Sequence, residues 1–189
     1  APTFLMPNYR RPNVTGGTYF ITQVTYQRQS WLCNETARDA LRSAIQQVRI
    51  NHPFQIDAFV LLPNHFHCLL TLPPNDKDIS TRIRLIKTYV TRHYADDLEV
   101  NQERSASRTK RKERNVWQRR FWEHLIRDDA DFERHCDYIH YNPVHHQYCQ
   151  SPTEWQFSSI HRLIEWGWYV SDWGNDKISV ELEGSQYDI

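Results

Sequence analysis

The segment Leu61-Leu62-Pro63-Asn64-His65-Phe66-His67-Cys68-Leu69-Leu70-Thr71-Leu72 carries the clearest structural pattern in this sequence. After Pro63-Asn64, successive side chains alternate between two sides. One side is wholly apolar and consists of Phe66, Cys68, Leu70 and Leu72. The other side consists of His65, His67, Leu69 and Thr71. A period of two is typical of a β-strand, so we expect one face on the hydrophobic core and two imidazoles side by side on the other.

The two imidazoles are candidate metal ligands. Neutral imidazole binds divalent cations well, and two such groups on one rigid strand supply most of a small site. A His-x-His pair on a half-exposed strand also occurs by chance. The metal interpretation of His65 and His67 therefore depends on whether another segment supplies the missing groups.

The segments around this strand predict alternating strands and helices. Residues 18–26 are rich in β-branched and aromatic residues, which favours a strand. Asn34 can cap a helix from Glu35 to about Ile50. Residues 56–62 predict a second strand, and Pro63-Asn64 joins it to the third as an antiparallel hairpin.

The following segments complete a recognisable order. A second helix is expected from Ile79 to about Tyr94, and a fourth strand in the later part of residues 116–127. The apolar residues of that helix should face inward, namely Ile83, Ile86 and Val90. Its basic residues should lie around the outer surface, namely Arg82, Arg84, Lys87 and Arg92. The order strand, helix, strand, strand, helix, strand is that of an α+β, ferredoxin-like antiparallel sheet with both helices on one face.

We expect one domain over residues 1–150 and a C-terminal tail over residues 151–189. Residues 1–15 should form an extended arm that contains Arg10 and Arg11. Residues 99–115 are charged and have little to bury, which predicts a flexible basic loop. The tail is too aromatic to be disordered throughout, so it should pack on the domain, where we expect it to gate entry to the functional site.

Composition limits the classes of function. The chain has 23 basic and 23 acidic residues, so nucleic-acid binding would have to come from local patches. No apolar run approaches the length of a membrane span and no signal peptide is evident. Four cysteines without a C-x-x-C pair indicate reduced thiols. We therefore expect a cytoplasmic protein with no membrane partner.

A helix after the fourth strand supplies the groups that the histidine pair lacks. It should begin at Asp128 or Asp129 and end near Asn142, because a residue before proline disfavours helix. Tyr138 and Asn142 are four residues apart and share a helical face. If this helix docks on the histidine face of the sheet, Asn142 completes a three-ligand site with the tyrosine hydroxyl beside it. Two imidazoles and an amide oxygen suit Mg²⁺ or Mn²⁺.

Five segments in order resemble the REP-associated tyrosine transposases, within the HUH single-tyrosine nucleases. The resemblance extends over roughly residues 9–162. The matching segments are Gly16-Gly17-Thr18-Tyr19-Phe20, Leu62-Pro63-Asn64-His65-Phe66-His67, Trp117-Gln118-Arg119-Arg120-Phe121-Trp122-Glu123-His124-Leu125-Ile126-Arg127, Asp137-Tyr138-Ile139-His140-Tyr141-Asn142-Pro143-Val144 and Trp155-Gln156-Phe157-Ser158-Ser159.

The resemblance implies an enzyme that cuts and rejoins single-stranded DNA beside hairpins of palindromic repeats. It implies that His65 and His67 bind a divalent metal and that Tyr138 is the nucleophile, forming a 5′-phosphotyrosine without ATP. Related insertion-sequence transposases carry a glutamine where this chain has Asn142, so the third metal ligand departs from their pattern. A monomer is favoured as the working state.

Several basic residues are candidates for contacts with DNA phosphates, because guanidinium and ammonium groups supply most such contacts. They are Arg10, Arg11, Lys110, Arg111, Lys112, Arg119, Arg120 and Arg127.

Three alternatives remain open on the sequence. Tyr141 lies three residues after Tyr138 on the same helix and is a second candidate nucleophile. Cysteine and histidine side chains in and after the helix could bind zinc, although their spacing fits no common finger. These are Cys136, His140, His145, His146 and Cys149. The chain could also be a non-catalytic ferredoxin-like module that binds single-stranded nucleic acid.

Overall fold

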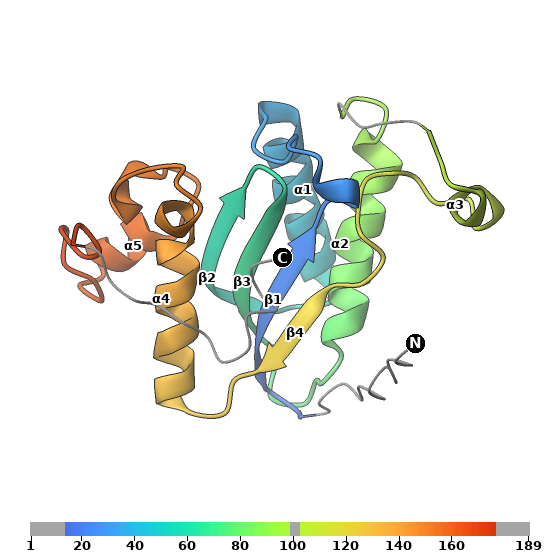
Figure 1. The fold of residues 1–189 in the computed structure, drawn as a ribbon. Helices are drawn as coiled ribbons and strands as arrows, with labels where there is room; N and C mark the ends of the chain where they lie inside the picture. The colour runs from blue at the N-terminus through green and yellow to red at the C-terminus, as the bar shows by residue number, and fades with distance from the viewer. Residues whose placement is uncertain (1–13, 99–102, 177–189) are drawn as a thin grey trace, which may run out of the picture.

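A four-stranded antiparallel sheet forms the centre of the protein in a computed structural model that describes residues 14–98 and 103–176 (Figure 1). The strands are β1 (Thr18–Val24), β2 (Gln55–Leu62), β3 (His65–Thr71) and β4 (Trp122–Leu125), in the order β2-β3-β1-β4. Helices α1 (Glu35–Asn51) and α2 (Ile79–Tyr94) pack together on one face, and α4 (Asp129–His145) packs against β2 and β3. The predicted ferredoxin-like α+β fold is confirmed.

Strand β3 separates two hydrophobic clusters, of which its alternation predicted the one under Phe66, Cys68 and Leu70. Phe66, Cys68 and Leu70 are buried in the larger cluster with the apolar stripes of α1 and α2. Leu69 lies in a smaller cluster with Cys136 and Ile139 of α4. Because α4 covers the second face, His65 and His67 are fully buried rather than half exposed.

Both helices of the first face begin and end close to their predicted bounds. The Asn34 side chain accepts from the backbone N–H of Ala37 at 2.7 Å, which is the geometry of a helix N-cap. The prediction that Arg82 lies on the outer surface of α2 is wrong. Arg82 is buried, donates to the Pro53 carbonyl and pairs with Asp76 at 2.7 Å. The guanidinium exchanges water for these partners, so a charged residue fits a buried helical position.

Helix α4 continues past the predicted stop at Asn142 and ends at His145. Pro143 lies inside the helix and is buried. A proline removes its own N–H, but its carbonyl still accepts, here from Tyr148 at 2.9 Å, and Asn142 accepts from His146 at 3.0 Å. These bonds on the C-terminal side of the proline add one turn to the helix.

The described part of the predicted basic loop, residues 99–115, contains a short helix, and its predicted flexibility stays a prediction. Residues 106–110 form α3 (Ala106–Lys110), which the Ser105 side chain caps. Arg108 of this helix is buried. Its guanidinium lies 3.9 Å from the ring centroid of Tyr26, in the short helix η1 (Tyr26–Arg28). The guanidinium also donates to the carbonyls of Arg114 and Trp117. One arginine therefore ties this segment to the domain.

Residues after α4 lie along the β2 edge of the sheet. They include the short helices η2 (Pro152–Glu154) and α5 (Ile160–Glu165). Leu61 N–H donates to the Phe157 carbonyl, Ser159 N–H donates to the Phe59 carbonyl, and Trp155 Nε1 donates to the Leu61 carbonyl at 2.8 Å. These bonds occupy backbone groups that an edge strand otherwise exposes.

Some predicted features lie outside the described residues. They are the N-terminal arm through residue 13, with Arg10 and Arg11, and residues 177–189 of the tail. Within the described residues, the four cysteines are unpaired and none of the helices is long and apolar enough to cross a membrane.

Candidate active site

The histidine pair lies on β3, where the strand passes between β1 and β2. The ring centroids of His65 and His67 are 4.8 Å apart. His65 Nδ1 bonds to the Asn64 side-chain oxygen at 2.6 Å, and an amide oxygen can only accept. His67 Nδ1 bonds to the Thr22 hydroxyl of β1 at 2.7 Å. Nδ1 of His65 therefore carries the proton, which makes Nε2 its metal-binding atom. The Thr22 hydroxyl can donate or accept, and where it accepts from Nδ1–H of His67, Nε2 is the metal-binding atom of that ring as well.

The electrostatics of the site keep His67 neutral. Burial lowers the pKa of His67 well below its ordinary value, and the neighbouring rings of His65 and His146 lower it further. A neutral imidazole retains the lone pair that a metal ligand needs. Sequence reasoning found the pair but missed Thr22, whose role requires the register that places it opposite His67.

Helix α4 brings Tyr138 and Asn142 to this histidine face. The ring centroids of His67 and Tyr138 are 5.3 Å apart, and Phe20 of β1 lies against both rings. The stripe that docks the helix includes Cys136 and Ile139, so the neighbouring position 138 points along the sheet toward the histidines. The tertiary structure thus joins groups separated by about seventy positions in the sequence.

The side chains fit a divalent cation. Asn142 is 1% exposed, yet neither its amide oxygen nor its amide nitrogen has a hydrogen-bond partner among the described residues. The same holds for His67 Nε2. Buried polar atoms are normally paired, so an imidazole nitrogen and an amide oxygen left in this state are suited to a ligand. His65, His67 and Asn142 could hold such an ion, and His146 lies 5.3 Å from His65 between ring centroids.

The alternatives from the sequence occupy other surroundings. Tyr141 packs edge-on against Trp173 of the C-terminal segment, with 6.4 Å between ring centroids. His140 Nε2 bonds to the Ser159 hydroxyl at 2.8 Å and Cys136 lies in the hydrophobic cluster. The proposed zinc ligands do not converge in the part of the chain that the structure describes.

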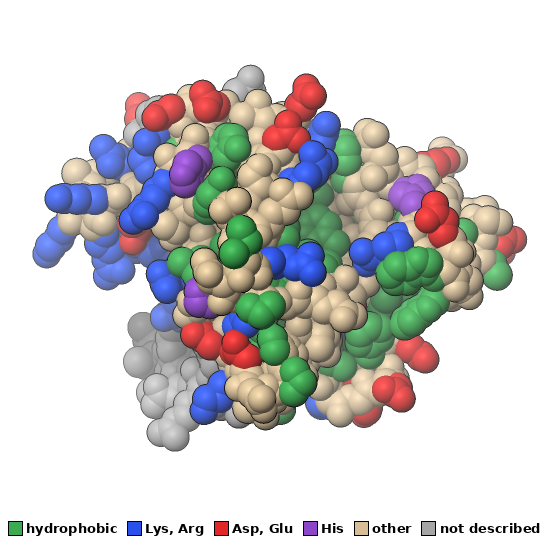
Figure 2. Space-filling view, turned by 180° about the vertical axis from the view of Figure 1, so that it is seen from behind, with side chains coloured by type: hydrophobic (Ala, Val, Ile, Leu, Met, Phe, Trp, Pro, Cys, Tyr) green, Lys and Arg blue, Asp and Glu red, His purple; other side chains and the backbone are tan. Residues whose placement is uncertain are grey.

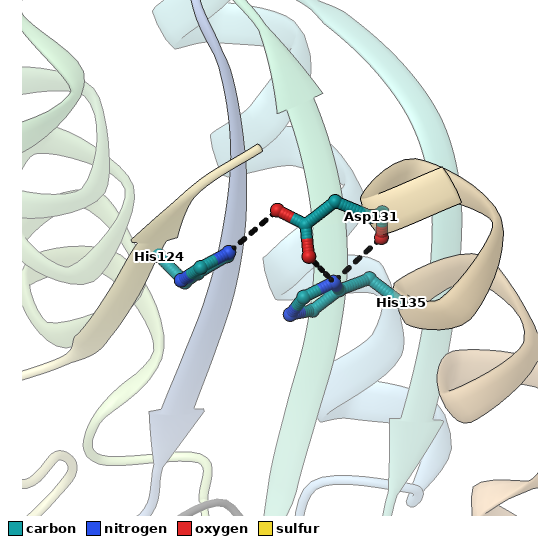
Figure 3. A group of neighbouring side chains, drawn as sticks. All are labelled: His124, Asp131 and His135. Atoms are coloured by element: carbon teal, nitrogen blue, oxygen red, sulfur yellow. Dashed lines mark hydrogen bonds and ion pairs between the residues drawn. The ribbon is translucent and has the colours of Figure 1, made fainter. Parts of the chain in front are cut away.

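A second histidine group stands at the start of α4 (Figure 3). The rings of His124 from β4 and His135 from α4 stack with 4.6 Å between their centroids, and Asp131 lies beside both. These three residues bring ligand atoms within 4.8 Å of one another. His124 Nε2 is 2.8 Å from an Asp131 carboxylate oxygen, and His135 Nδ1 donates to the Asp131 carbonyl at 2.7 Å. The composition of this group allows a metal.

The surroundings of Asp131 favour a structural role instead. Its carboxylate also accepts from the backbone and guanidinium of Arg127 and from Arg134. Burial by itself would raise the pKa of Asp131, but hydrogen bonds from Arg127 and His124 outweigh it and lower the pKa far below the ordinary range. Donors therefore surround the carboxylate, which ties β4 to α4.

Four of the eight predicted phosphate-contacting residues lie together between α2 and the segment before β4, namely Arg111, Lys112, Arg119 and Arg120. A groove of about 770 Å³ lies there, and its only acidic lining residue is Glu113. Its basic lining residues are Arg84, Lys87, Arg92, Arg108, Arg111, Lys112, Arg114, Arg119 and Arg120. We name it the basic groove. Figure 2 shows lysine and arginine side chains gathered at this end of the molecule.

Some of the predicted phosphate-contacting residues already pair with carboxylates of the protein, and others are exposed. Arg119 pairs with Glu113 at 2.7 Å, and Arg127 pairs with Asp131 at 3.1 Å. Arg111, Lys112 and Arg120 are exposed in the groove, and Lys110 is exposed outside its lining.

The sheet, its two strand histidines and the helical tyrosine all lie within residues that match a known family of transposases. Residues 13–142 match the family model described as "Transposase IS200 like". An Escherichia coli K12 REP-associated tyrosine transposase is 41% identical over 171 residues, covering 90% of this chain and 93% of the relative. A Haemophilus influenzae protein assigned to the same group is also 41% identical, covering 90% and 95%.

A solved structure agrees with these relatives. It is a REP-associated tyrosine transposase bound to a REP hairpin, with a TM-score of 0.74 and 38% identity, covering 94% of this chain and 98% of that chain. The present chain belongs to the REP-associated tyrosine transposases.

Proposed function

We propose that the protein is a metal-dependent single-strand DNA endonuclease and strand transferase that acts at palindromic repeat hairpins. The observation that carries the proposal is the convergence of His67, Tyr138 and the buried amide of Asn142 on one face of the sheet. Acting on DNA, it would work in the cytoplasm, with a monomer sufficient for one cut.

The proposed chemistry begins with Tyr138. Its phenolic oxygen attacks the scissile phosphorus, a tyrosine–phosphorus bond forms and the bond to the 3′ oxygen breaks. The phenol loses its proton and the leaving oxygen takes one up, which gives a 5′-phosphotyrosine and a free 3′-hydroxyl. A bound Mg²⁺ or Mn²⁺ would polarise the phosphate and offset its developing charge. The reverse attack by a 3′-hydroxyl rejoins DNA without ATP.

The residues of this chain have separate tasks in that scheme. His65 and His67 hold the ion through Nε2, while Asn64 and Thr22 fix the two rings by their hydrogen bonds to Nδ1. Asn142 would supply an amide oxygen from the helix that carries the nucleophile, so α4 would hold one metal ligand and Tyr138 at a fixed spacing.

The hairpin partner is proposed from the solved relative and from the basic groove. That relative is bound to a REP hairpin. Cations crowded in one groove, with a single carboxylate, attract a phosphate backbone irrespective of its sequence. We assign the duplex stem to the basic groove, with Arg111, Lys112 and Arg120 as its exposed contacts.

The test uses labelled single-stranded oligonucleotides that contain the palindromic repeats flanking the gene. Protein, oligonucleotide and Mn²⁺ or Mg²⁺ are incubated and resolved on a denaturing gel. We expect a covalent adduct that chelator, Tyr138→Phe and His67→Ala each abolish.

Tyr141→Phe is the matched control, because it removes a phenolic hydroxyl from the same helix, three residues after Tyr138. Its adduct should equal that of the wild type. An adduct that survives Tyr138→Phe but disappears in Tyr141→Phe would move the nucleophile. Tight hairpin binding with no adduct in any protein would instead identify the non-catalytic module.

A further inference from the structure

A second groove lies at the opposite edge of the sheet, between α1 and the C-terminal segment. It has a volume of about 1070 Å³ and is lined by α1, β2, the start of α4 and α5. Figure 2 shows a hollow between the central helices and the C-terminal segment, bordered by hydrophobic and basic side chains. We call it the tryptophan groove, after its lining residues Trp166 and Trp168.

These two tryptophans are held at the surface by the end of α5. They are 61% and 65% exposed. Gly167 has a φ of +76°, and its N–H donates to the Ile164 carbonyl while Trp168 N–H donates to that of Leu163. This is a Schellman termination, which glycine permits at low cost. The turn fixes two large aromatic side chains beside the groove instead of burying them.

The charge of the tryptophan groove matches a polyanion. Its lining contains Arg38, Arg42, Arg49 and Arg162 but only one carboxylate, Asp57. Arg162 lies 4.9 Å above the Trp166 ring and donates to the β2 carbonyls of Ile56 and Asp57. Exposed aromatic rings beside guanidinium groups are the combination that binds unpaired bases by stacking and their phosphates by charge.

The order of the strands places this groove on the far side of the active site from the basic groove. The basic groove adjoins the segment that enters β4, the histidines lie on the central strand β3, and the tryptophan groove adjoins β2. A strand that leaves a hairpin stem at the β4 side and crosses the active site would emerge at the β2 edge. A duplex offers no exposed base faces to tryptophan, so the fitting ligand there is single-stranded.

We propose that the tryptophan groove binds the unpaired DNA strand that continues beyond the cleavage site. This inference rests on the proposed function. It adds a contact through base stacking that selects single strands flanking a hairpin, separate from the phosphate contacts of the basic groove.

The test measures fluorescence anisotropy with three labelled DNAs in chelator. They are a blunt hairpin, the same hairpin with an unpaired extension, and the extension alone. The variant is Trp166→Ala with Trp168→Ala. Loss of stacking should weaken binding of the extended hairpin by about tenfold or more, while affinity for the blunt hairpin stays within about twofold, since the basic groove is unchanged.

Two controls separate stacking from folding and from general hydrophobicity. Trp166→Phe with Trp168→Phe keeps aromatic faces and should restore most of the affinity. Ile50→Ala removes a side chain that is 69% exposed but does not line the groove, and it should leave all three affinities unchanged.

Three outcomes would overturn the proposal. The first is an alanine variant that binds the extended hairpin as tightly as the wild type does. The second is an alanine variant that loses affinity equally for the blunt and the extended hairpin. The third is a wild-type dimer in light scattering that the alanine variant dissociates, which would make this surface an interface between copies. An absent covalent adduct would refute the nuclease proposal alone, because the binding comparison needs no cleavage.

Discussion

The two faces of the sheet use the same strands for different purposes. The face under α1 and α2 packs Phe66, Cys68 and Leu70 into a large apolar cluster. The face under α4 has a smaller apolar cluster and buries His65 and His67 among it. The first face contributes mainly folding free energy through apolar burial, and the second accepts buried polar atoms that a ligand can satisfy.

This difference shows how a small domain buries a polar site on one face of its sheet while the other face stabilises the fold. Adjacent residues of β3 point to opposite faces, so a change at position 66 and a change at position 67 should separate stability from chemistry.

The largest effect is expected from Phe66→Ala. Phe66 is 4% exposed in the larger cluster, so the variant should lose about 3–5 kcal/mol of unfolding free energy. Urea unfolding measures the loss, and adduct formation per folded molecule should stay close to wild type. A variant that keeps its stability but loses cleavage would contradict the division between the faces.

His67→Ala should impair cleavage and not hairpin binding. Removing one imidazole should slow adduct formation at least about a hundredfold, because a metal ligand is lost. The hairpin affinity measured by anisotropy in chelator should hardly change. Thr22→Val is a milder variant that removes only the hydrogen bond to Nδ1 of His67. If higher Mn²⁺ restores its rate of adduct formation, the variant has weakened metal binding.

Asp131→Asn should weaken the junction of β4 and α4 and cause an intermediate loss of unfolding free energy. Its partners Arg127 and Arg134 are about half exposed, at 56% and 48%, so solvent screening limits the loss to about 1–3 kcal/mol. Folding lowers the pKa of Asp131. The carboxylate therefore stabilises the fold above its unfolded pKa of about 4, and that contribution declines as the pH falls below it.

Thermal or urea unfolding from pH 7 to pH 3 checks this prediction. The stability difference between wild type and Asp131→Asn should stay constant down to about pH 4 and then shrink. Asp129→Asn, an exposed change in the same helical turn, is the control. A difference that grows on acidification would contradict the assigned sign.

The smallest effect is expected from Arg120→Gln in the basic groove. Loss of one phosphate contact should weaken hairpin binding a few-fold and reduce the slope of log affinity against log salt by about 1. Cleavage at saturating DNA should not change, since Tyr138 is not among the residues that line the groove. Lys110→Gln, exposed outside the groove lining, should leave the slope at its wild-type value.

Local patterns predicted most of the elements, and the errors share one physical cause. Arg82 and Arg108 carry full charges, so hydropathy placed them in water, but backbone carbonyls and Asp76 satisfy them inside the fold. Pro143 was expected to end α4, yet the helix continues past it. In each case a partner distant in sequence or a later hydrogen bond overcame a local preference.

The sequence by itself determined the alternation of β3, the order of strands and helices, and the identities of His65, His67, Tyr138 and Asn142 as candidates. Periodicity and spacing report these because they depend on residues a few positions apart. Only the tertiary structure decided that α4 covers the histidine face, that Thr22 meets His67, and that Tyr138 rather than Tyr141 lies beside it. Those contacts depend on strand register and helix docking, which hydrophobic packing across the whole domain sets.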